Sequence, residues 1–240
     1  MILVMFRRSV ARTGVLSLVL FSTGGCSSAD SDTLPETGTP AVSETAAPGG
    51  STNAAGAEAL LNPNLAGESD LAAVAGMNGA AVQAILAGRP FMDMVALDQA
   101  ISSHVADREP LYAALWVPLN LNTASEEEIL LIPGVGDRMA HEFDEYRPYD
   151  GMARFRREIG KYVDEAEVER LAGYVFVPIE LNTATDEEIL AIPGVGDRML
   201  HEFKEYRPYT SMDQFMREIG KYVDDAELAR LARYVTLANN

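Results

Sequence analysis

The feature that most constrains the fold of this chain is an internal repeat. Residues 121–178 and 181–238 align without a gap, and 41 of the 58 aligned positions are identical. A more divergent copy precedes them, in which Arg-Pro-Phe at 89–91 stands where the next copy has Arg-Pro-Tyr at 147–149. Because repeated sequence units fold into repeated structural units, we predict three of them. We call them copy one (60–119), copy two (120–179) and copy three (180–240).

The apolar residues within each copy recur with the period of short amphipathic helices. Ser125 with Glu128, and Thr185 with Glu188 in copy three, form capping boxes that open a first helix, which stops at Pro-Gly. We expect a second helix to begin with Asp137 as its N-cap, a third to cover 152–159, and a fourth to follow Asp164. No strand pattern is present, so the sequence predicts an all-α fold with about four short helices in each copy.

The loop between the first and second helices reads Ile-Pro-Gly-Val-Gly-Asp-Arg, at 132–138 and again at 192–198. Two glycines around one apolar residue allow a tight turn with positive φ, while the valine packs into the core. Backbone N–H groups then face outward at the start of the second helix, where they suit a phosphate, and the following arginine adds a charged contact. The predicted phosphate-binding residues are Gly134, Val135, Gly136 and Arg138 in copy two, and Gly194, Val195, Gly196 and Arg198 in copy three.

These motifs resemble a known family. Leu-Asn-Thr-Ala at 121–124, the acidic first helix, Ile-Pro-Gly-Val-Gly and a helix that ends near Tyr-Arg are similar to the helix-hairpin-helix family, and most closely to ComEA-type proteins of DNA uptake. The resemblance covers about residues 60 to 240 and is specific in copies two and three. It implies sequence-independent binding of double-stranded DNA through hairpin amides, with no catalysis and no cofactor.

A second hairpin, which family members commonly have, would fall at 159–164, where Lys161 and Val163 stand at the two hairpin glycine positions. Lys161, and Lys221 in copy three, offer point charges to phosphate there instead. Copy one has Gly-Met-Asn at 76–78 and no arginine after it, so we expect it to be structural. We expect Arg-Pro-Tyr at 147–149 to lock the turn between two helices rather than to present an aromatic ring to a base.

Charge is the strongest objection to DNA binding. The chain has a formal net charge of -17, and residues 121–240 contain 14 basic and 25 acidic side chains. Most non-specific DNA affinity comes from Lys and Arg that release counterions, so any binding must be weak and local. Arg154, Arg156, Arg157 and Lys161 are the best candidate for a basic cluster. The alternative is a protein-interaction or scaffold module of a membrane-associated complex, which does not bind DNA.

Residues for catalysis or metal binding are scarce. The sequence contains one Cys and three His, and His141 and His201 lack the H-E-x-x-H spacing of a zinc site, so we expect them at the surface and predict no metal. No Ser-His-Asp set or nucleotide-binding loop is present. We therefore expect a protein that is not an enzyme.

The N-terminal residues are typical of a secretion signal. A charged start, a short apolar run and small residues before Cys26 predict a signal segment over 1–26, resembling that of a bacterial lipoprotein, in which Cys26 is lipidated. An ordinary cleaved signal that leaves a free thiol is the alternative. Residues 27–59 are rich in Ser, Thr, Ala, Pro and Gly and predict a disordered linker. Together these features predict a chain that is secreted across the cytoplasmic membrane, lipid-anchored, and periplasmic or on the cell surface.

Overall fold

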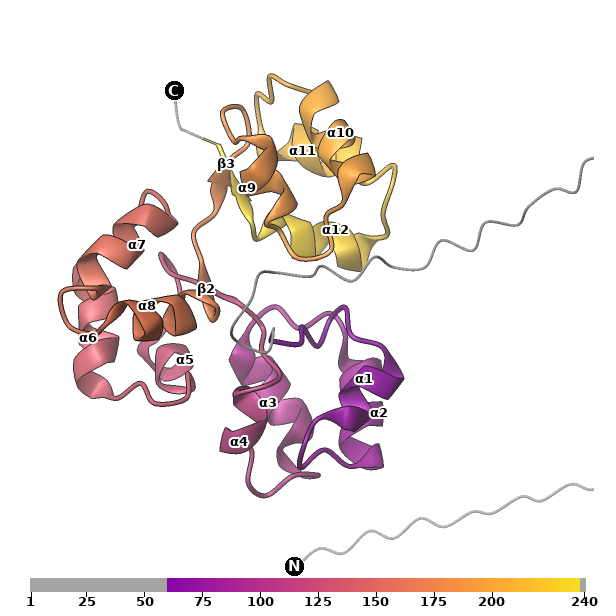
Figure 1. The fold of residues 1–240 in the computed structure, drawn as a ribbon. Helices are drawn as coiled ribbons and strands as arrows, with labels where there is room; N and C mark the ends of the chain where they lie inside the picture. Colours follow the sequence, from indigo (N-terminus) through magenta and orange to yellow (C-terminus); the bar gives the residue numbers. More distant parts are fainter. Residues whose placement is uncertain (1–59, 238–240) are drawn as a thin grey trace, which may run out of the picture. The chain divides into compact units, whose positions relative to one another are not determined.

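The computed structural model describes residues 60–237, and this part of the chain is mostly helical (Figure 1). The predicted signal segment, Cys26 and the predicted linker lie outside the described residues. Copy one contains α1 (Glu68–Ala73), α2 (Gly79–Gly88), α3 (Met94–Ser102) and α4 (Glu109–Tyr112). Copy two contains α5 (Glu126–Leu130), α6 (Asp137–Glu145), α7 (Met152–Ile159) and α8 (Glu165–Ala172). Copy three contains α9 (Asp186–Leu190), α10 (Asp197–Glu205), α11 (Met212–Ile219) and α12 (Asp225–Ala232).

The prediction of a chain without strands is wrong, because four strands of two residues each are present. They are β1 (Leu119–Asn120), β2 (Val175–Phe176), β3 (Ile179–Glu180) and β4 (Val235–Thr236). β1 pairs with β2 and β3 pairs with β4, both in parallel, and an isolated parallel bridge joins Leu61 to Leu115. Each pairing joins the first residues of a copy to its last. A two-residue strand is too short to show the alternating pattern by which a strand is recognised in sequence.

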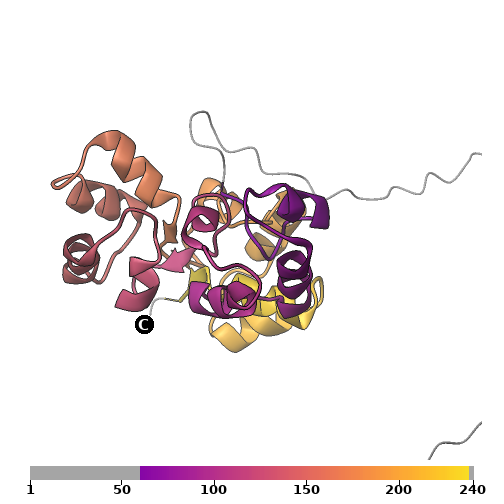
Figure 2. The ribbon, with the colours of Figure 1, turned by 90° about the horizontal axis from the view of Figure 1, so that it is seen from below.

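Aromatic rings fill the centre of copies two and three. Phe143 and Phe155 are fully buried and pack edge to face, with ring centroids 5.2 Å apart, and Phe203 and Phe215 repeat this contact at 5.3 Å. Edge-to-face packing is a favoured arrangement for such rings. Seen from below, the helices of copy two again form a group around a common centre (Figure 2). The apolar helix faces read from the sequence therefore do form the core.

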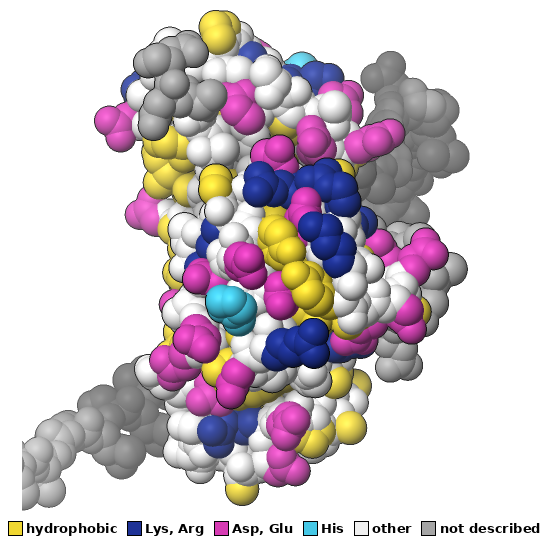
Figure 3. All heavy atoms as spheres, turned by 90° about the vertical axis from the view of Figure 1, so that its left-hand side faces the viewer, with side chains coloured by type: hydrophobic (Ala, Val, Ile, Leu, Met, Phe, Trp, Pro, Cys, Tyr) yellow, Lys and Arg dark blue, Asp and Glu magenta, His cyan; other side chains and the backbone are white. Residues whose placement is uncertain are grey.

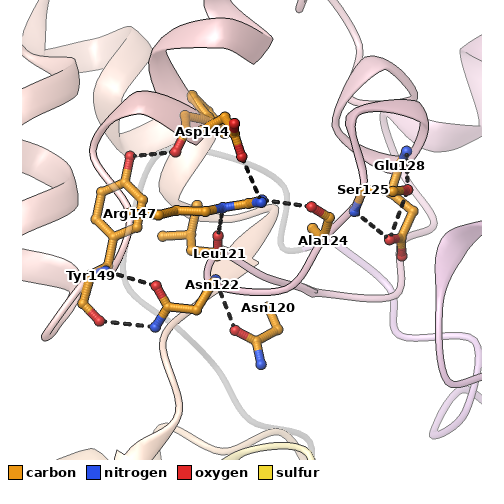
Figure 4. Close-up of polar contacts among 10 residues, drawn as sticks. Asn120, Leu121, Asn122, Ala124, Ser125, Glu128, Asp144, Arg147 and Tyr149 are labelled. Carbon is orange, nitrogen blue, oxygen red and sulfur yellow. Dashed lines mark hydrogen bonds and ion pairs between the residues drawn. The ribbon is translucent and has the colours of Figure 1, made fainter.

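The start of each copy is tied to its middle by a pair of hydrogen bonds from one asparagine (Figure 4). Asn122 donates from Nδ2 to the carbonyl of Tyr149 over 2.9 Å, and its Oδ1 accepts from the Tyr149 N–H over 2.7 Å. The same two bonds join Asn64 to Phe91 in copy one and Asn182 to Tyr209 in copy three. All three copies, including the divergent first one, thus share one local architecture around this contact.

Arg147 makes a second tie at the same place. Its guanidinium donates to the carbonyl of Ala124 over 2.6 Å and to that of Leu121 over 2.5 Å. Arg89 and Arg207 donate to the corresponding carbonyls of Ala66 and Ala184. Tyr149 is 3% exposed, and burial raises the pKa of its phenol to about 12. Arg-Pro-Tyr therefore locks a turn, as expected, and does not present its ring to a ligand.

We predict that Asn122→Ala lowers the free energy of unfolding by about 2 kcal/mol or more, because it removes two hydrogen bonds and leaves half-buried backbone groups without partners. Urea denaturation of the chain measures this change. Thr123→Ala is the control, since Thr123 is exposed and adjacent in sequence. Equal stability of the two variants would show that the asparagine contact is unimportant.

Candidate nucleic-acid interface

The hairpin loops adopt the turn that their glycines predict. Gly134 and Gly194 have φ angles of 81° and 82°, in the region that favours glycine. The Val135 N–H donates to the carbonyl of Ile132 over 3.0 Å, and the Val135 side chain is buried. Val195 makes the same backbone bond and is half-buried. The valines thus fix the loops from inside, and the Val135 and Val195 amides that we predicted as phosphate contacts are already occupied.

The helices that follow these loops begin without a side-chain cap. The N-cap of α6 is Gly136, not Asp137 as predicted, and the N-cap of α10 is Gly196. Glycine has no side chain to accept from the first turn, and the first N–H groups of a helix have no partner within it. Gly136, Asp137 and Arg138 are exposed. Their counterparts Gly196, Asp197 and Arg198 are exposed as well. These amides form a partly positive donor set open to an anion.

Helices α2, α8 and α12 begin with a side-chain cap, whereas α7, like α6 and α10, begins at a glycine without one. Asn78 caps α2 by accepting from the Ala81 N–H over 2.9 Å, in the copy that we expected to be structural. Asp164 caps α8 by accepting from Glu167, and Asp224 caps α12 by accepting from Glu227, over 2.9 and 2.8 Å. A carboxylate therefore fills the position that a phosphate would need at each degenerate second hairpin.

Lys161 and Lys221 are not free for phosphate, contrary to the prediction. Lys161 forms an ion pair with Glu158, and Lys221 forms one with Glu218. The hydrogen bond to Glu158 raises the pKa of Lys161, and the same contact lowers the pKa of Glu158. Each ammonium also lies over a tyrosine ring, 4.9 Å from the centroid of Tyr146 in copy two. The sequence alone did not reveal these pairs, because Lys161 has more than one acid at a similar sequence distance, including Glu158 and Asp164.

Arg138 and Arg198 keep their charge available. Within residues 60–237 they are the exposed Arg and Lys side chains that have no carboxylate partner. The predicted basic cluster is neutralised, since Arg156 pairs with Glu169 and Arg157 pairs with Glu158. Figure 3 shows the face on which α6 and α7 lie, where Lys and Arg stand beside Asp and Glu rather than in one continuous basic patch.

A shallow pocket of about 450 Å³ lies at the start of α6. Its lining consists of Gly136, Asp137, Arg138, Met139, Glu142 and Tyr162. Tyr162 belongs to the loop between α7 and α8 and is 38% exposed, so the degenerate second hairpin contributes an aromatic wall to the first hairpin's site. This placement could not be predicted from the sequence, because it depends on how α6 meets that loop. Asp137 and Glu142 put two carboxylates beside the open amides.

The described residues show neither a metal centre nor a membrane span. Within 60–237, no group of three or more His, Cys, Asp and Glu side chains is placed to hold a metal ion. His141 and His201 are exposed, with Nε2 atoms 3.7 and 3.4 Å from Glu145 and Glu205. In the same range, each helix is too short or too polar to cross a bilayer.

Comparisons with known proteins give one distant relative. No model of a protein family matches the chain, and no solved structure matches it. A bovine (Bos taurus) protein, "Endonuclease/exonuclease/phosphatase family domain-containing protein 1", is 25% identical over 160 residues. The match covers 49% of this chain, and the chain spans only 28% of the length of that relative.

This comparison contradicts the expectation that the chain is not an enzyme. The relative is named for a family of enzymes, so an activity is not excluded by the lack of a familiar catalytic motif in this sequence. The expectation was wrong because it rested on motifs alone, and a site assembled from distant residues leaves no local signature.

We predict that Gly136→Asn with Gly196→Asn raises the free energy of unfolding by a few tenths of a kcal/mol, because asparagine supplies the missing cap. A Cβ at either glycine would meet no atom within 4 Å, so the side chain fits. The reverse change in copy one, Asn78→Gly, should lower stability by a similar amount. Urea denaturation compares the three proteins, and a loss of stability in the double variant would contradict the account of α6 and α10 as uncapped.

Proposed function

We propose that this chain binds duplex DNA without sequence preference, as a tandem array of helix-hairpin-helix units of the ComEA type. The hairpins of copies two and three hold backbone phosphates through the N–H groups at the start of α6 and α10. The observation that carries the proposal is the pairing, at both places, of a glycine N-cap with an arginine that has no carboxylate partner.

The chemistry of these two sites suits a phosphate. Unpaired N–H groups at a helix N-terminus attract anions through both hydrogen bonds and the helix dipole. Arg138 and Arg198 can then add a charge-assisted bond to the same group. Contacts to phosphate carry no sequence information, because every nucleotide presents the same oxygens. Binding of this kind is expected to be independent of base sequence.

The acidic surface limits the affinity. At physiological salt, charges further apart than about 8 Å are largely screened, so carboxylates on other faces matter less than those at the site. Asp137 and Asp197 stand in the first turn beside the open amides and oppose an anion there. Glu158 and Glu218 also neutralise Lys161 and Lys221, so these two lysines do not add to the attraction for phosphate. We therefore expect weak binding that depends strongly on salt.

The distant relative supports the ligand class. Its name joins endonucleases, exonucleases and phosphatases, which share phosphate esters as substrates. Phosphate is also the group that the open amides would hold. Because the relative is named for enzymes, DNA recovered from every binding experiment should be run on a denaturing gel, with Mg²⁺ present, to detect cleavage.

The N-terminal region adds a proposal on location. Residues 1–26 read as a signal that directs secretion, and Cys26 as the residue that is lipidated to anchor the chain. DNA would then be met outside the cytoplasm, in the periplasm or at the cell surface. Mass spectrometry of the purified mature protein tests this, since an N-terminal peptide that begins at an unmodified residue would contradict the lipid anchor.

We predict that Arg138→Glu with Arg198→Glu weakens binding to labelled duplex DNA and lowers the slope of log affinity against log salt by about 2, one for each lost phosphate contact. Fluorescence anisotropy at several salt concentrations measures both quantities. Arg157→Glu with Arg217→Glu is the matched control, because those arginines are also exposed yet are paired with Glu158 and Glu218. Equal losses in the two proteins would mean that net charge alone, not the hairpins, drives binding.

We also predict that Gly136→Asn with Gly196→Asn weakens DNA binding while the fold becomes no less stable. The new side chains occupy the amides that a phosphate would contact, at positions where they meet no other atom. The same anisotropy titration measures the loss. Unchanged affinity in this double variant would exclude the hairpin amides as the binding groups.

A scaffold role remains the second candidate, favoured by one observation. Glu126 and Glu127 in α5 and Glu187 in α9 are exposed and have no ion-pair partner, so copies two and three both present unneutralised acidic helix starts. Such a surface suits a basic protein partner. Absence of DNA binding at low salt would leave this function in place of the first.

A further inference from the structure

Glu142 and Glu202 are buried carboxylates with unused hydrogen-bonding capacity. Each is 9% exposed, on α6 and α10 respectively, and in each the Oε2 atom has no hydrogen-bond partner. A buried acceptor that lacks a donor costs free energy, and native proteins rarely leave one without a reason. The same unpartnered oxygen occurs at the same position in both copies. A ligand that donates a hydrogen bond to this oxygen would satisfy it in both copies.

The position of Glu142 indicates which ligand. It lines the pocket of about 450 Å³ whose other walls include Gly136, Arg138 and Tyr162. The Tyr162 hydroxyl lies 2.8 Å from that of Tyr146, and hydrogen bonding with Tyr146 and with Glu142 raises the pKa of Tyr162. Tyr162 therefore stays protonated and engaged with these neighbours. The second carboxylate oxygen still lacks a donor, and the pocket is of the size that small ligands occupy.

The pocket thus combines groups that favour ligands of opposite kinds. The open amides and Arg138 require an anion, whereas Glu142 requires a neutral or positive hydrogen-bond donor. The interior of a DNA strand offers phosphate but no hydroxyl on its sugar. A ribonucleotide offers both, because its 2′-hydroxyl is a donor close to the phosphate, and this hydroxyl is what allows proteins to distinguish RNA from DNA.

We propose that the pocket at the start of α6 prefers ribonucleotide units, with the phosphate on the amides there and the 2′-hydroxyl donating to Glu142. We extend this assignment to α10 because Glu202 has the same unpartnered oxygen, although Glu202 does not line the pocket beside α10. This inference rests on the proposed function, because it assumes that phosphate occupies the amides. It changes the preferred nucleic acid from DNA to RNA and assigns a specificity-determining role to two buried acids. The carboxylates repel phosphate, so they favour only a ligand that also brings a donor.

The test compares three single-stranded oligonucleotides of one sequence by fluorescence anisotropy with the full chain: RNA, 2′-O-methyl RNA and DNA. The methyl group keeps the ribose but removes the donor. Because a hydrogen bond to a charged group is stronger than one between neutral groups, RNA should bind roughly tenfold more tightly than the other two. Equal affinities for RNA and 2′-O-methyl RNA would overturn the inference while leaving the proposed function intact.

Variants assign the preference to the two acids. Glu142→Leu with Glu202→Leu should abolish the difference between RNA and 2′-O-methyl RNA, whatever its effect on overall affinity. Glu145→Leu with Glu205→Leu is the matched control, because these acids lie on the same helices but are more than half exposed. A preference that survives in the first variant overturns the inference. Failure of all three single strands to bind the unmodified chain would overturn the inference, whereas the proposed function fails only if labelled duplex DNA also does not bind at low salt. The comparison of ligands needs no variant to fold.

Discussion

Helix starts must find hydrogen-bond acceptors, and this constraint dominates a chain built from such short helices. Every α-helix leaves its first N–H groups without internal partners. In helices of four to ten residues, those groups are a large share of the backbone. Side chains supply an acceptor at most of the helix starts described above, namely at Asn78, Asp93, Ser125, Asp164, Thr185, Ser211 and Asp224. α6, α7 and α10 begin with glycine instead, so their first amides depend on solvent or on a ligand; α6 and α10 also carry an exposed arginine without a carboxylate partner in the first turn.

The rest of each copy holds these two starts in place. The Asn122 and Arg147 ties fix the first residues of copy two to the chain just beyond α6, and the buried Val135 fixes the hairpin loop from inside. Phe143 anchors α6 in the aromatic core. A donor set is useful for binding only when it is held rigidly before the ligand arrives, because ordering it afterwards would oppose association. These contacts thus hold the uncapped start of α6 in a fixed position before a ligand binds.

Charge acts locally in this protein. Most exposed basic side chains are paired with acids, so the formal charge says little about any one site. Arg138 and Arg198 stand next to the open amides without such partners. Asp137 and Glu142 line the same pocket as Arg138, which distinguishes this site from a uniformly basic groove. A ligand with both acceptors and donors satisfies this mixed surface better than a bare anion does.

Local sequence signals predicted the helices well. The capping boxes at Ser125 and Thr185, the stop at Pro-Gly and the positive φ of Gly134 all depend on a few neighbouring residues, and all are present. Features that depend on distant residues were missed: the two-residue strands, the Asn122 tie and the approach of Tyr162 to α6. The pairing of Lys161 with Glu158 was missed for a different reason, since several acids were equally near in sequence.

The most direct test of the account is the response of individual backbone amides to a titrated nucleic acid. In ¹H–¹⁵N spectra, addition of duplex DNA should shift the signals of residues 136–139 and 196–199. The Glu167 amide in the first turn of α8 should remain unchanged, because it already donates to Asp164. Shifts confined to α8, or an absence of shifts at both hairpins despite binding, would contradict the claim that uncapped helix starts hold the phosphate.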